Sequence, residues 1–433
     1  MRKIGMISLG CAKNQVDSEM ILGILTNNGY EIVGDAQDAD LLIVNTCGFI
    51  NSAKEEAIET INDLNDIKKP YQKLVVCGCY AQRYKEKLIS EFPFVDLVLT
   101  FKDYPHFLSK INALFEEQES DECLSYHHKV LISSQFTPYI RISDGCNNRC
   151  SYCAIPLIRG KYISRPMEDI IAEIKEEVSL GAKEINLISQ DTTNYGTDLY
   201  KENKFVELLK EIEKIEGIFL IRILYMYPDL ITDELIDLIK NSNKIAHYFD
   251  VPIQHSSSKV LKLMNRRGDH KLLENLLLKI KREIPDAILR TTVIVGFPGE
   301  CDEDFADLLD FVKKIEFDHL GCFMYSKEED TLAYNMENEV LSDVINRRYN
   351  EIMQVQKSIS YHKNHQKIGK EYMAIVDFKE EETNNLYLRS YMDAPDEVDG
   401  YIVTEDKKDV KIGDVVKVKI VSAFTYDLFG KII

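Results

Sequence analysis

Three cysteines lie close together near the middle of the chain, in the segment DGCNNRCSYC (residues 144–153). Cys146, Cys150 and Cys153 have the spacing C-x3-C-x2-C and are called the core triplet below. Three thiolates on one short loop can bind three irons of a cubane cluster and leave the fourth iron without a protein ligand. An open metal position is what a catalytic metal site needs. A substrate that carries an amine and a carboxylate can chelate that iron.

Two other uses of these cysteines fit the sequence less well. A zinc site normally takes four ligands in paired spacings, and no partner pair lies near the core triplet. A disulfide is disfavoured in the cytosol, where ten cysteines in a chain of 433 residues do not indicate a disulfide framework. We therefore interpret the core triplet as cluster ligands.

The first region of the chain, up to about Glu119, alternates apolar strands with helices. This alternation predicts a parallel sheet with helices on both faces. The expected strands are Lys3–Leu9, Leu41–Asn45, Lys73–Val76 and Val95–Thr100, and the expected helices are Asp17–Asn28 and a helix from a capping box at Ser52 to Leu64.

The rest of the chain predicts two further folds. Six strand–helix units between about Ser133 and His365 predict a partial barrel, because a closed barrel of the usual kind needs eight. Short alternating segments from Gln366 onward predict a small antiparallel barrel. The expected class is α/β, with domains at residues 1–118, 132–364 and 366–433. The six expected strands of the partial barrel are Tyr139–Ser143, Glu184–Ser189, Phe219–Met226, Ala246–Pro252, Leu289–Val295 and His319–Met324.

A second set of cysteines follows the first three strands of the first region. Cys11, Cys47 and Cys79, called the N-terminal triplet below, each stand beside a glycine. The carboxyl ends of parallel strands face one crevice, so these thiols could together hold a second cluster. The alternative is that each is a small buried hydrophobic residue. Cys77 cannot face the same way as Cys79 in an extended strand and is expected in the core. Three other cysteines lack a partner pattern and are expected to be structural: Cys123, Cys301 and Cys322.

The formal net charge of −19 argues against a protein that grips a phosphate backbone over a wide face. It suits a basic protein partner, although an acidic surface can also serve solubility alone. From Gln366 onward, ten Lys and Arg against fourteen Asp and Glu give 10 − 14 = −4. A local basic patch of Lys407, Lys408, Lys417 and Lys419 stays possible. The chain has no apolar run of about 18 residues and no signal-like start, so we expect no membrane span and a cytoplasmic location.

The core triplet, with Tyr152 before its last cysteine and a position at the end of the first barrel strand, resembles the radical S-adenosylmethionine enzymes. The resemblance implies that S-adenosylmethionine chelates the open iron and is cleaved to a 5′-deoxyadenosyl radical. It also implies cofactor contacts at five positions. These are Tyr152 beside the adenine, Gln190 and Asp191 after the second barrel strand, and Gly296 and Glu300 in the segment VGFPGE (residues 295–300).

The order of the three regions resembles the methylthiotransferases within that class. These enzymes insert a sulfur into an unactivated C–H bond and cap it with a methyl group. The resemblance implies two 4Fe–4S clusters, at the core triplet and the N-terminal triplet, and S-adenosylmethionine as the source of both the radical and the methyl group. It implies a TRAM domain at the C-terminus. No catalytic side chain beyond the cluster ligands is assigned.

Two acceptors are known for bacterial branches of this family, a tRNA adenosine and an aspartate of ribosomal protein S12. The segments SLGCAKNQVDSE (residues 8–19), NTCGFI (45–50) and YMYP (225–228) resemble the protein-modifying branch. The tRNA branch typically has Gln where this chain has Ala12. The implied partners are S12, free or in the small ribosomal subunit, a reductant such as flavodoxin or ferredoxin, and a sulfur donor; the chain is expected to be a monomer.

Two other functions are also compatible with the sequence. One is methylthiolation of a tRNA adenosine at its 2-position, which is the same chemistry on another acceptor. The other is a non-catalytic RNA- or ribosome-binding protein whose cysteines hold zinc.

Overall fold

The computed structural model describes residues 1–396, 398–405 and 409–433, and its chain contacts separate into two units. Unit 1 comprises residues 1–132, 144–147 and 153–162, and unit 2 comprises residues 133–143, 148–152 and 163–433. The division into three domains at 1–118, 132–364 and 366–433 stays a prediction. Lys407 and Lys408 of the possible basic patch lie outside the described residues. Among the helices that the structure describes, none combines the length and the apolar composition needed to cross a membrane.

Unit 1 is built on a sheet of parallel strands in the order β2-β1-β3-β4-β5. The sheet consists of β1 (Arg2–Ser8), β2 (Tyr30–Ile32), β3 (Leu41–Thr46), β4 (Lys73–Cys77) and β5 (Leu97–Val98). Every residue of β3 is buried because helices cover both faces, which explains its unbroken apolar run. The connecting helices are α1 (Ala12–Asn27), η1 (Ala36–Asp38), α2 (Asn51–Ile67), α3 (Gly78–Glu91), η2 (Phe101–His106) and α4 (Phe107–Leu114).

The two faces of this sheet are covered by different helices. Helices α1 and α4 pack on one face through Ile21 and Ile111, and α2 and α3 pack on the other through Ile61 and Leu88. The predicted parallel sheet with helices on both faces is therefore confirmed. The predicted capping box is wrong, because α2 begins at Asn51 after an N-cap at Ile50 and has no side-chain cap.

Unit 2 contains six parallel strands that alternate with helices, as predicted. They form two three-stranded parts, β10-β9-β6 and β11-β12-β13, which a parallel bridge between Ile221 and Ile245 joins. The strands are β6 (Tyr139–Arg141), β9 (Glu184–Ile188), β10 (Leu220–Ile223), β11 (Tyr248–Asp250), β12 (Ile288–Val295) and β13 (His319–Met324). A short ladder joins β7 (Ser143–Asp144) to β8 (Ile163–Ser164).

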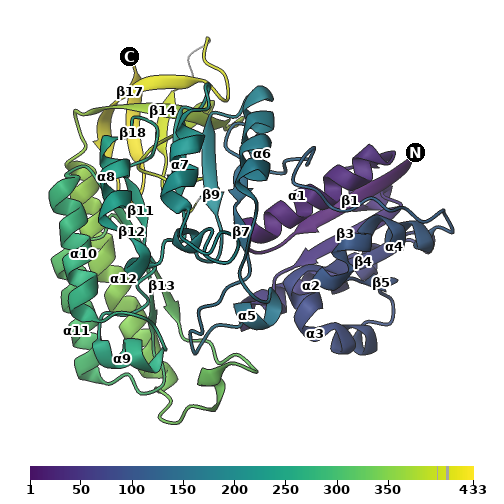
Figure 1. Cartoon of the computed structure of the whole chain (residues 1–433), viewed down its shortest axis with the longest axis horizontal. Helices are drawn as coiled ribbons and strands as arrows, with labels where there is room; N and C mark the ends of the chain where they lie inside the picture. The colour runs from purple at the N-terminus through teal and green to yellow at the C-terminus, as the bar shows by residue number, and fades with distance from the viewer. Residues whose placement is uncertain (397, 406–408) are drawn as a thin grey trace. The chain divides into compact units, whose positions relative to one another are not determined.

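The helices of this partial barrel cover its outer side, and one large apolar core fills the space between them and the strands. They are α6 (Met167–Ser179), α7 (Phe205–Glu213), α8 (Asp233–Asn241), α9 (Ser258–Leu263), α10 (His270–Glu283), α11 (Asp302–Ile315) and α12 (Ser342–His365), with α5 (Ile155–Ile158) belonging to unit 1. Helices α10, α11 and α12 run beside one another along the partial barrel (Figure 1). Short 3-10 turns are η3 (Thr192–Asn194), η4 (Pro228–Leu230) and η5 (Leu332–Asn335).

The C-terminal strands close into a small barrel in the order β14-β15-β16-β18-β17. They are β14 (Glu371–Lys379), β15 (Asn385–Ser390), β16 (Ile402–Glu405), β17 (Val415–Ala423) and β18 (Leu428–Ile432). The expectation that the barrel is antiparallel is correct for four pairs and wrong for β16 with β18, which are parallel. Strand directions cannot alternate all the way round a closed ring of five, so one parallel pair is unavoidable.

The small barrel contacts the partial barrel at the amino ends of the large strands. Glu184, the first residue of β9, accepts hydrogen bonds from Arg222 of β10 at 2.7 Å and pairs with Arg389 of β15 at 2.9 Å, with all three side chains fully buried. His319, the first residue of β13, lies 3.0 Å from the carbonyl oxygen of Met392. The carboxyl ends of the large strands, where the predicted cofactor residues stand, are therefore at the opposite end of unit 2.

Candidate functional site

The N-terminal triplet stands at one edge of the unit 1 sheet. Cys11 is the N-cap of α1 after β1, Cys47 follows β3 directly, and Cys79 is the second residue of α3 after β4. Strands β1, β3 and β4 are neighbours, and all three run parallel. The three thiols therefore leave adjacent strands at their carboxyl ends, as the sequence predicts.

Glycines beside these cysteines allow the three loops to approach closely. A β-carbon on Gly10 would lie 2.8 Å from the Cβ of Cys47 and 2.9 Å from its Sγ. A β-carbon on Gly48 would lie 2.7 Å from the Cα of Tyr80, the residue after Cys79. Such separations are too short for any side chain, so glycine is required at both positions.

A buried polar network fixes the loops that carry the N-terminal triplet. The side-chain Nδ2 of Asn14 donates to the carbonyl oxygen of Leu9 at 2.7 Å and to that of Asn45 at 3.2 Å. The side chain of Asn45 in turn donates to the carbonyl oxygen of Asn14 and to Ser18 Oγ, both at 2.8 Å. These buried side-chain amides donate to backbone and hydroxyl oxygens, so they hold the loop after β1 against the end of β3.

Local charges act differently on the three thiols. Around the Cys11 sulfur, desolvation raises the pKa even though the residue as a whole is exposed, but Lys13, Arg159 and nearby backbone N–H groups outweigh it, so the pKa of Cys11 is lowered. Burial raises the pKa of Cys47, and it raises that of Cys79 to about 12 although Arg159 opposes the shift. Cys77 lies in the hydrophobic core, as expected, and burial raises its pKa as well.

The three cysteines expected to be structural occupy unrelated positions. Cys322 is buried in the apolar core of the partial barrel, and Cys301 is the N-cap of α11. Cys123 is exposed, and its thiol donates to the carbonyl oxygen of Pro105 at 3.2 Å.

The core triplet lies on the loop between β7 and α5. Gly145, just before it, has φ +71°, and a β-carbon there would lie 2.1 Å from the carbonyl oxygen of Lys161. The N–H of Cys146 donates to the carbonyl oxygen of Gly160 at 3.2 Å. Glycine is therefore required before the first cysteine so that the loop can fold back on the chain after α5. Cys146 and Cys153 belong to unit 1, and Cys150 belongs to unit 2.

Within unit 2, Cys150 contacts two side chains from other parts of the partial barrel. Its Sγ lies 3.7 Å from the hydroxyl of Tyr227 and 3.8 Å from Nη1 of Arg266. The guanidinium of Arg266 stands 4.3 Å above the Tyr227 ring, donates to Tyr152 Oη at 3.3 Å, and donates to the carbonyl oxygen of Pro252 at 2.6 Å. Arg266 thus contacts a cysteine, two aromatic side chains and the chain just after β11.

Of the five residues expected to meet S-adenosylmethionine, Tyr152 lies on the cysteine loop and the other four follow the carboxyl ends of barrel strands. Asp191, after β9, is buried and accepts a hydrogen bond from Asn148 of the cysteine loop at 2.7 Å and one from Thr193 at 3.0 Å. Burial raises the pKa of Asp191. Gln190 precedes it at the end of the same strand. The Asn148–Asp191 hydrogen bond joins the end of β9 to the cysteine loop.

The segment after β12 is folded by its own contacts. Glu300 accepts hydrogen bonds from the N–H groups of Gly296 at 2.6 Å and Phe297 at 3.1 Å, and it pairs with Arg348 of α12 at 3.0 Å. A β-carbon on Gly296 would lie 2.4 Å from Cγ1 of Ile345, so the missing side chain makes room for α12. The contacts of both residues give the loop its shape, and their expected contact with the cofactor stays a prediction.

Two non-glycine residues at the ends of barrel strands have left-handed backbone conformations. Tyr225, after β10, has φ +61°, and Gln254, after β11, has φ +67°. Each such residue costs on the order of 1–3 kcal/mol and persists where its surroundings fix it. The N–H of Tyr225 donates to Asp250 at 2.8 Å, and the backbone of Gln254 bonds to β12 on both sides. Strain of this kind is typical of functional sites.

Each triplet supplies three thiols, and thiolates are the usual protein ligands of iron–sulfur clusters. Within the described residues, no group of three or more His, Cys, Asp or Glu side chains is placed to surround one metal ion. A cubane binds each thiolate to a different iron, so its ligands stand further apart than those of one ion. None of these six cysteines forms a disulfide in the structure.

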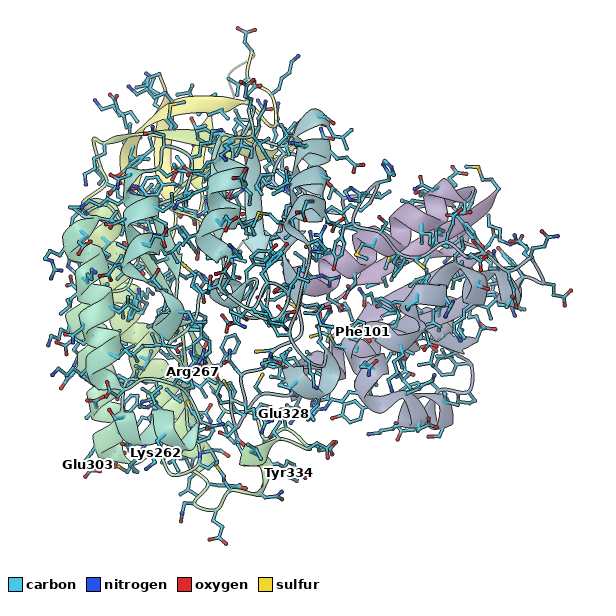
Figure 2. The ribbon with its side chains drawn as sticks, in the orientation of Figure 1. Phe101, Lys262, Arg267, Glu303, Glu328 and Tyr334 are labelled. Carbon is cyan, nitrogen blue, oxygen red and sulfur yellow. The ribbon has the colours of Figure 1, made fainter. Side chains whose placement is uncertain are left out.

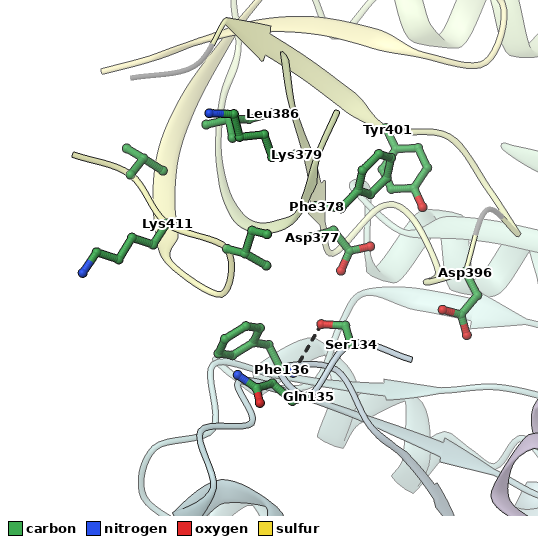
Figure 3. A pocket seen from close by; sticks show the side chains of 12 residues that line it. Ser134, Gln135, Phe136, Asp377, Phe378, Lys379, Leu386, Asp396, Tyr401 and Lys411 are labelled. Atoms are coloured by element: carbon green, nitrogen blue, oxygen red, sulfur yellow. Dashed lines mark hydrogen bonds between the residues drawn. The ribbon is translucent and has the colours of Figure 1, made fainter. Parts of the chain in front are cut away.

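A pocket of about 1000 Å³ in unit 2 is lined by no residue of either triplet and by no predicted cofactor residue. It lies between the Ser134–Phe136 segment and the small barrel, where Figure 3 shows Asp377, Phe378 and Tyr401 on one side and Phe136 on the other. Two lysines and two aspartates line the pocket, so their formal charges sum to zero. The pocket therefore supplies no argument about the chemistry at the cysteines.

Three parts of the chain match known families. Residues 3–100 match an uncharacterized protein family, UPF0004, residues 140–312 match the radical SAM superfamily, and residues 368–433 match the TRAM domain. The N-terminal triplet lies in the first match, the core triplet in the second, and the small barrel in the third.

Full-length relatives decide the family. The ribosomal protein uS12 methylthiotransferase RimO of Acetivibrio thermocellus is 45% identical over 447 residues, which cover 100% of this chain and 98% of the relative. The protein of the same name from Thermoanaerobacter sp. is 44% identical over 443 residues and covers 100% of both chains. This chain belongs to the uS12 methylthiotransferase family. It is a radical S-adenosylmethionine methylthiotransferase, and the two 4Fe–4S clusters and S-adenosylmethionine expected from the sequence are the cofactors of its family.

Solved structures with a similar fold are more distant. The radical S-adenosylmethionine methyltransferase TsrM from Kitasatospora setae is 14% identical, with a TM-score of 0.55 over 77% of this chain and 74% of that one. The cobalamin-dependent enzyme OxsB is 11% identical, with a TM-score of 0.53 over 82% of this chain and 56% of that one. Both confirm the predicted radical SAM fold of this methylthiotransferase.

Several residues of the two sites were not found from the sequence. Asn14 and Arg159 have buried side chains beside Cys79, and the partly buried Arg266 contacts Cys150; each of these cysteines is distant from its partner in sequence. Tyr227 belongs to the segment YMYP, whose sequence indicates only a resemblance to the protein-modifying branch.

Proposed function

We propose that this methylthiotransferase inserts a sulfur and a methyl group at the β-carbon of an aspartate of ribosomal protein S12. The proposal rests above all on Cys11, Cys47 and Cys79, which leave three adjacent parallel strands at the same edge. A radical enzyme with only the core triplet could generate a radical but would lack a site from which to deliver sulfur. The names of the full-length relatives support S12 as the acceptor.

We assign the cluster ligands to the two triplets. The core triplet binds the cluster that, with S-adenosylmethionine, supplies a 5′-deoxyadenosyl radical. The N-terminal triplet binds the second cluster, which carries the sulfur to be transferred. We further propose that the chain has domains at residues 1–118, 132–364 and 366–433, matching these roles and the small barrel.

This chain's own residues would orient the cofactor and the core triplet. Arg266 fixes Cys150 and Tyr152, and Asn148 ties the cysteine loop to Asp191. We propose Tyr152, Gln190, Asp191, Gly296 and Glu300 as the cofactor-binding residues. Gly296 and Glu300 would act by shaping the loop after β12.

The acceptor must reach the carboxyl ends of the large strands. The small barrel caps the amino ends, so a protein acceptor held on that barrel would extend along the partial barrel by about 20 Å, the rise of six strand residues. An extended protein segment can span that distance. The net charge of −19 favours a basic acceptor such as a ribosomal protein.

Other partners follow from the chemistry. We propose that a reductant such as flavodoxin or ferredoxin supplies electrons, that a separate donor replenishes the sulfur, and that the enzyme acts as a monomer in the cytoplasm on S12, free or in the small ribosomal subunit.

The mass of S12 from cells with and without the gene tests this function. The expected result is that an S12 peptide gains one methylthio group on an aspartate only when the gene is present, and that a variant with Cys47→Ala fails to restore it. An unchanged S12 mass together with loss of 2-methylthio nucleosides from tRNA would establish the other acceptor. A colourless protein that contains zinc and does not cleave S-adenosylmethionine would reject both enzymatic functions.

A further inference from the structure

A buried arginine lies among the residues of the N-terminal triplet. Arg159 follows α5, and its side chain is 2% exposed. Its Nη2 donates to Asp17 at 2.6 Å and to the Sγ of Cys79 at 3.7 Å, and its Nη1 donates to Asp144 at 3.1 Å. All of these residues belong to unit 1.

The surroundings fix this guanidinium in one orientation. Asp17, itself 2% exposed, and Asp144 neutralise its charge, which could not otherwise be buried. The face of the guanidinium lies 4.5 Å from the ring centre of Phe101, whose position Figure 2 labels, and Nη2 also lies 3.4 Å from Oδ1 of Asn14. A planar fork with five donors can satisfy this many partners at once, whereas an ammonium cannot.

Binding iron does not require this arginine. A thiolate ligand needs only its sulfur, and the glycines and Asn14 already shape the loops. Placing a cation here costs desolvation, and the structure balances it with two carboxylates while still directing one N–H at Cys79. The hydrogen bond from Arg159 to the Cys79 sulfur therefore has a role other than iron binding.

Hydrogen bonds to ligand sulfurs and local net charge set the reduction potential of an iron–sulfur cluster. Reduction adds negative charge to the cluster. A cationic donor on a ligand thiolate stabilises the reduced form more than the oxidised form, because the added charge strengthens the attraction.

We propose that Arg159 is a positioning residue of the N-terminal cluster that holds Cys79 through its hydrogen bond and raises the reduction potential of that cluster. Asp17 limits the effect by balancing part of the charge. The inference rests on the proposed assignment of Cys11, Cys47 and Cys79 as ligands.

The test is a redox titration of the N-terminal cluster alone, followed by electron paramagnetic resonance. The parent is the full-length protein with C146A, C150A and C153A, which leaves only the N-terminal triplet. R159Q, R159K and D17N are each added to this parent. R2Q is the matched control, because Arg2 is also an arginine of unit 1 that pairs with a glutamate, Glu117, but lies at the opposite end of β1 from Cys11.

R159Q should shift the midpoint potential to more negative values, and R159K should shift it less because the charge is kept. D17N should shift it to more positive values, since Arg159 then acts without its counter-charge. R2Q should leave it unchanged. Opposite shifts from R159Q and D17N are not expected if Arg159 only stabilises the fold, because breaking the ion pair from either side would then have the same effect.

Equal potentials in R159Q, R2Q and the parent would overturn the proposal, and so would shifts of the same sign in R159Q and D17N. If R159Q does not fold, R159K takes its place in the comparison with D17N. Shifts of the same sign in R159K and D17N, or no shift in either, would then overturn the proposal. A parent that binds no iron would overturn the ligand assignment itself, which is a different failure from a parent that binds iron but does not respond to Arg159.

Discussion

Gly10 packs its bare Cα against Cys47 so closely that a β-carbon on Gly10 would stand 2.9 Å from the Sγ of Cys47. The two residues follow different strands, β1 and β3, and their contact brings Cys11 and Cys47 to the same edge of the sheet. Neither Gly10 nor Cys47 belongs to a strand. Their close contact is therefore needed to form the cysteine site and is not needed to form the sheet.

Gly10→Ala should therefore remove the N-terminal cluster while leaving the core cluster in place. The added methyl group must displace Cys47, and the φ of +91° adds about 1–2 kcal/mol of backbone strain. Iron per chain should fall from about eight to about four, and cleavage of S-adenosylmethionine without acceptor should continue. Iron analysis and the yield of 5′-deoxyadenosine measure both.

Gly29→Ala is the matched control for that variant. Gly29 has φ +85°, so the backbone strain is similar, but a β-carbon there meets nothing within 4 Å. Its iron content should equal that of the unmodified enzyme. Equal iron loss in both variants would mean that the contact with Cys47 has no special part in cluster binding.

Arg266→Gln should impair the core cluster. Arg266 contacts Cys150 and Tyr152 and stacks on Tyr227, and a hydrogen bond to a charged group contributes about 1.5–3 kcal/mol. Cleavage of S-adenosylmethionine should fall at least tenfold, as measured by 5′-deoxyadenosine formation. Arg282→Gln is the control, because Arg282 is exposed and pairs with Glu283 at 3.4 Å. The assignment fails if the two variants lose activity equally.

The placement of the cysteines could be predicted from sequence because it follows from local patterns. Apolar runs mark β1, β3 and β4, parallel strands align their carboxyl ends, and so Cys11, Cys47 and Cys79 had to meet at one edge. The roles of Arg159 and Arg266 could not be predicted this way. Arg159 stands 80 residues from Cys79, and nothing in its local sequence indicates burial.

Two structural details show the same limit. The parallel pairing of β16 with β18 results from closing a ring of five strands, which no single strand reveals. The charged contacts of Glu184 with Arg222 and Arg389 are buried, although such residues are normally read as surface. In each case the property belongs to the assembled fold.

Glu184→Gln should lower the stability of unit 2. The substitution removes the carboxylate that pairs with the buried Arg222, whereas Arg389 keeps its pair with Asp377 at 2.9 Å, and breaking a buried ion pair from one side costs about 3–5 kcal/mol. The apparent melting temperature should fall while iron content at low temperature stays normal. Glu234→Gln breaks the exposed pair with Lys210 and should cost at most about 1 kcal/mol. Similar losses in both variants would contradict the importance of the buried network.

His255 should make stability depend on pH. It is fully buried and accepts a hydrogen bond from the N–H of Ser257, and burial lowers its pKa from 6.5 to about 4. The unfolded chain therefore binds a proton between pH 6.5 and about 4 that the folded chain excludes, so stability falls as pH falls through this range. The contribution lost at pH 5 is about 2 kcal/mol.

His255→Asn provides the comparison, because its side-chain oxygen can still accept from Ser257. The difference in melting temperature between pH 7 and pH 5 should be smaller in this variant than in the unmodified enzyme. An unchanged pH dependence would show that another group is responsible.

The central claim is that both triplets act together on ribosomal protein S12. The most direct measurement is the mass of an S12 peptide after purified S12 is incubated with the reconstituted enzyme, S-adenosylmethionine, a reductant and sulfide. The unmodified enzyme should add one methylthio group to an aspartate, and the Cys47→Ala variant should cleave S-adenosylmethionine without modifying S12. Modification of S12 by the Cys47→Ala variant at the normal rate, or no modification by the unmodified enzyme with both clusters present, would contradict it.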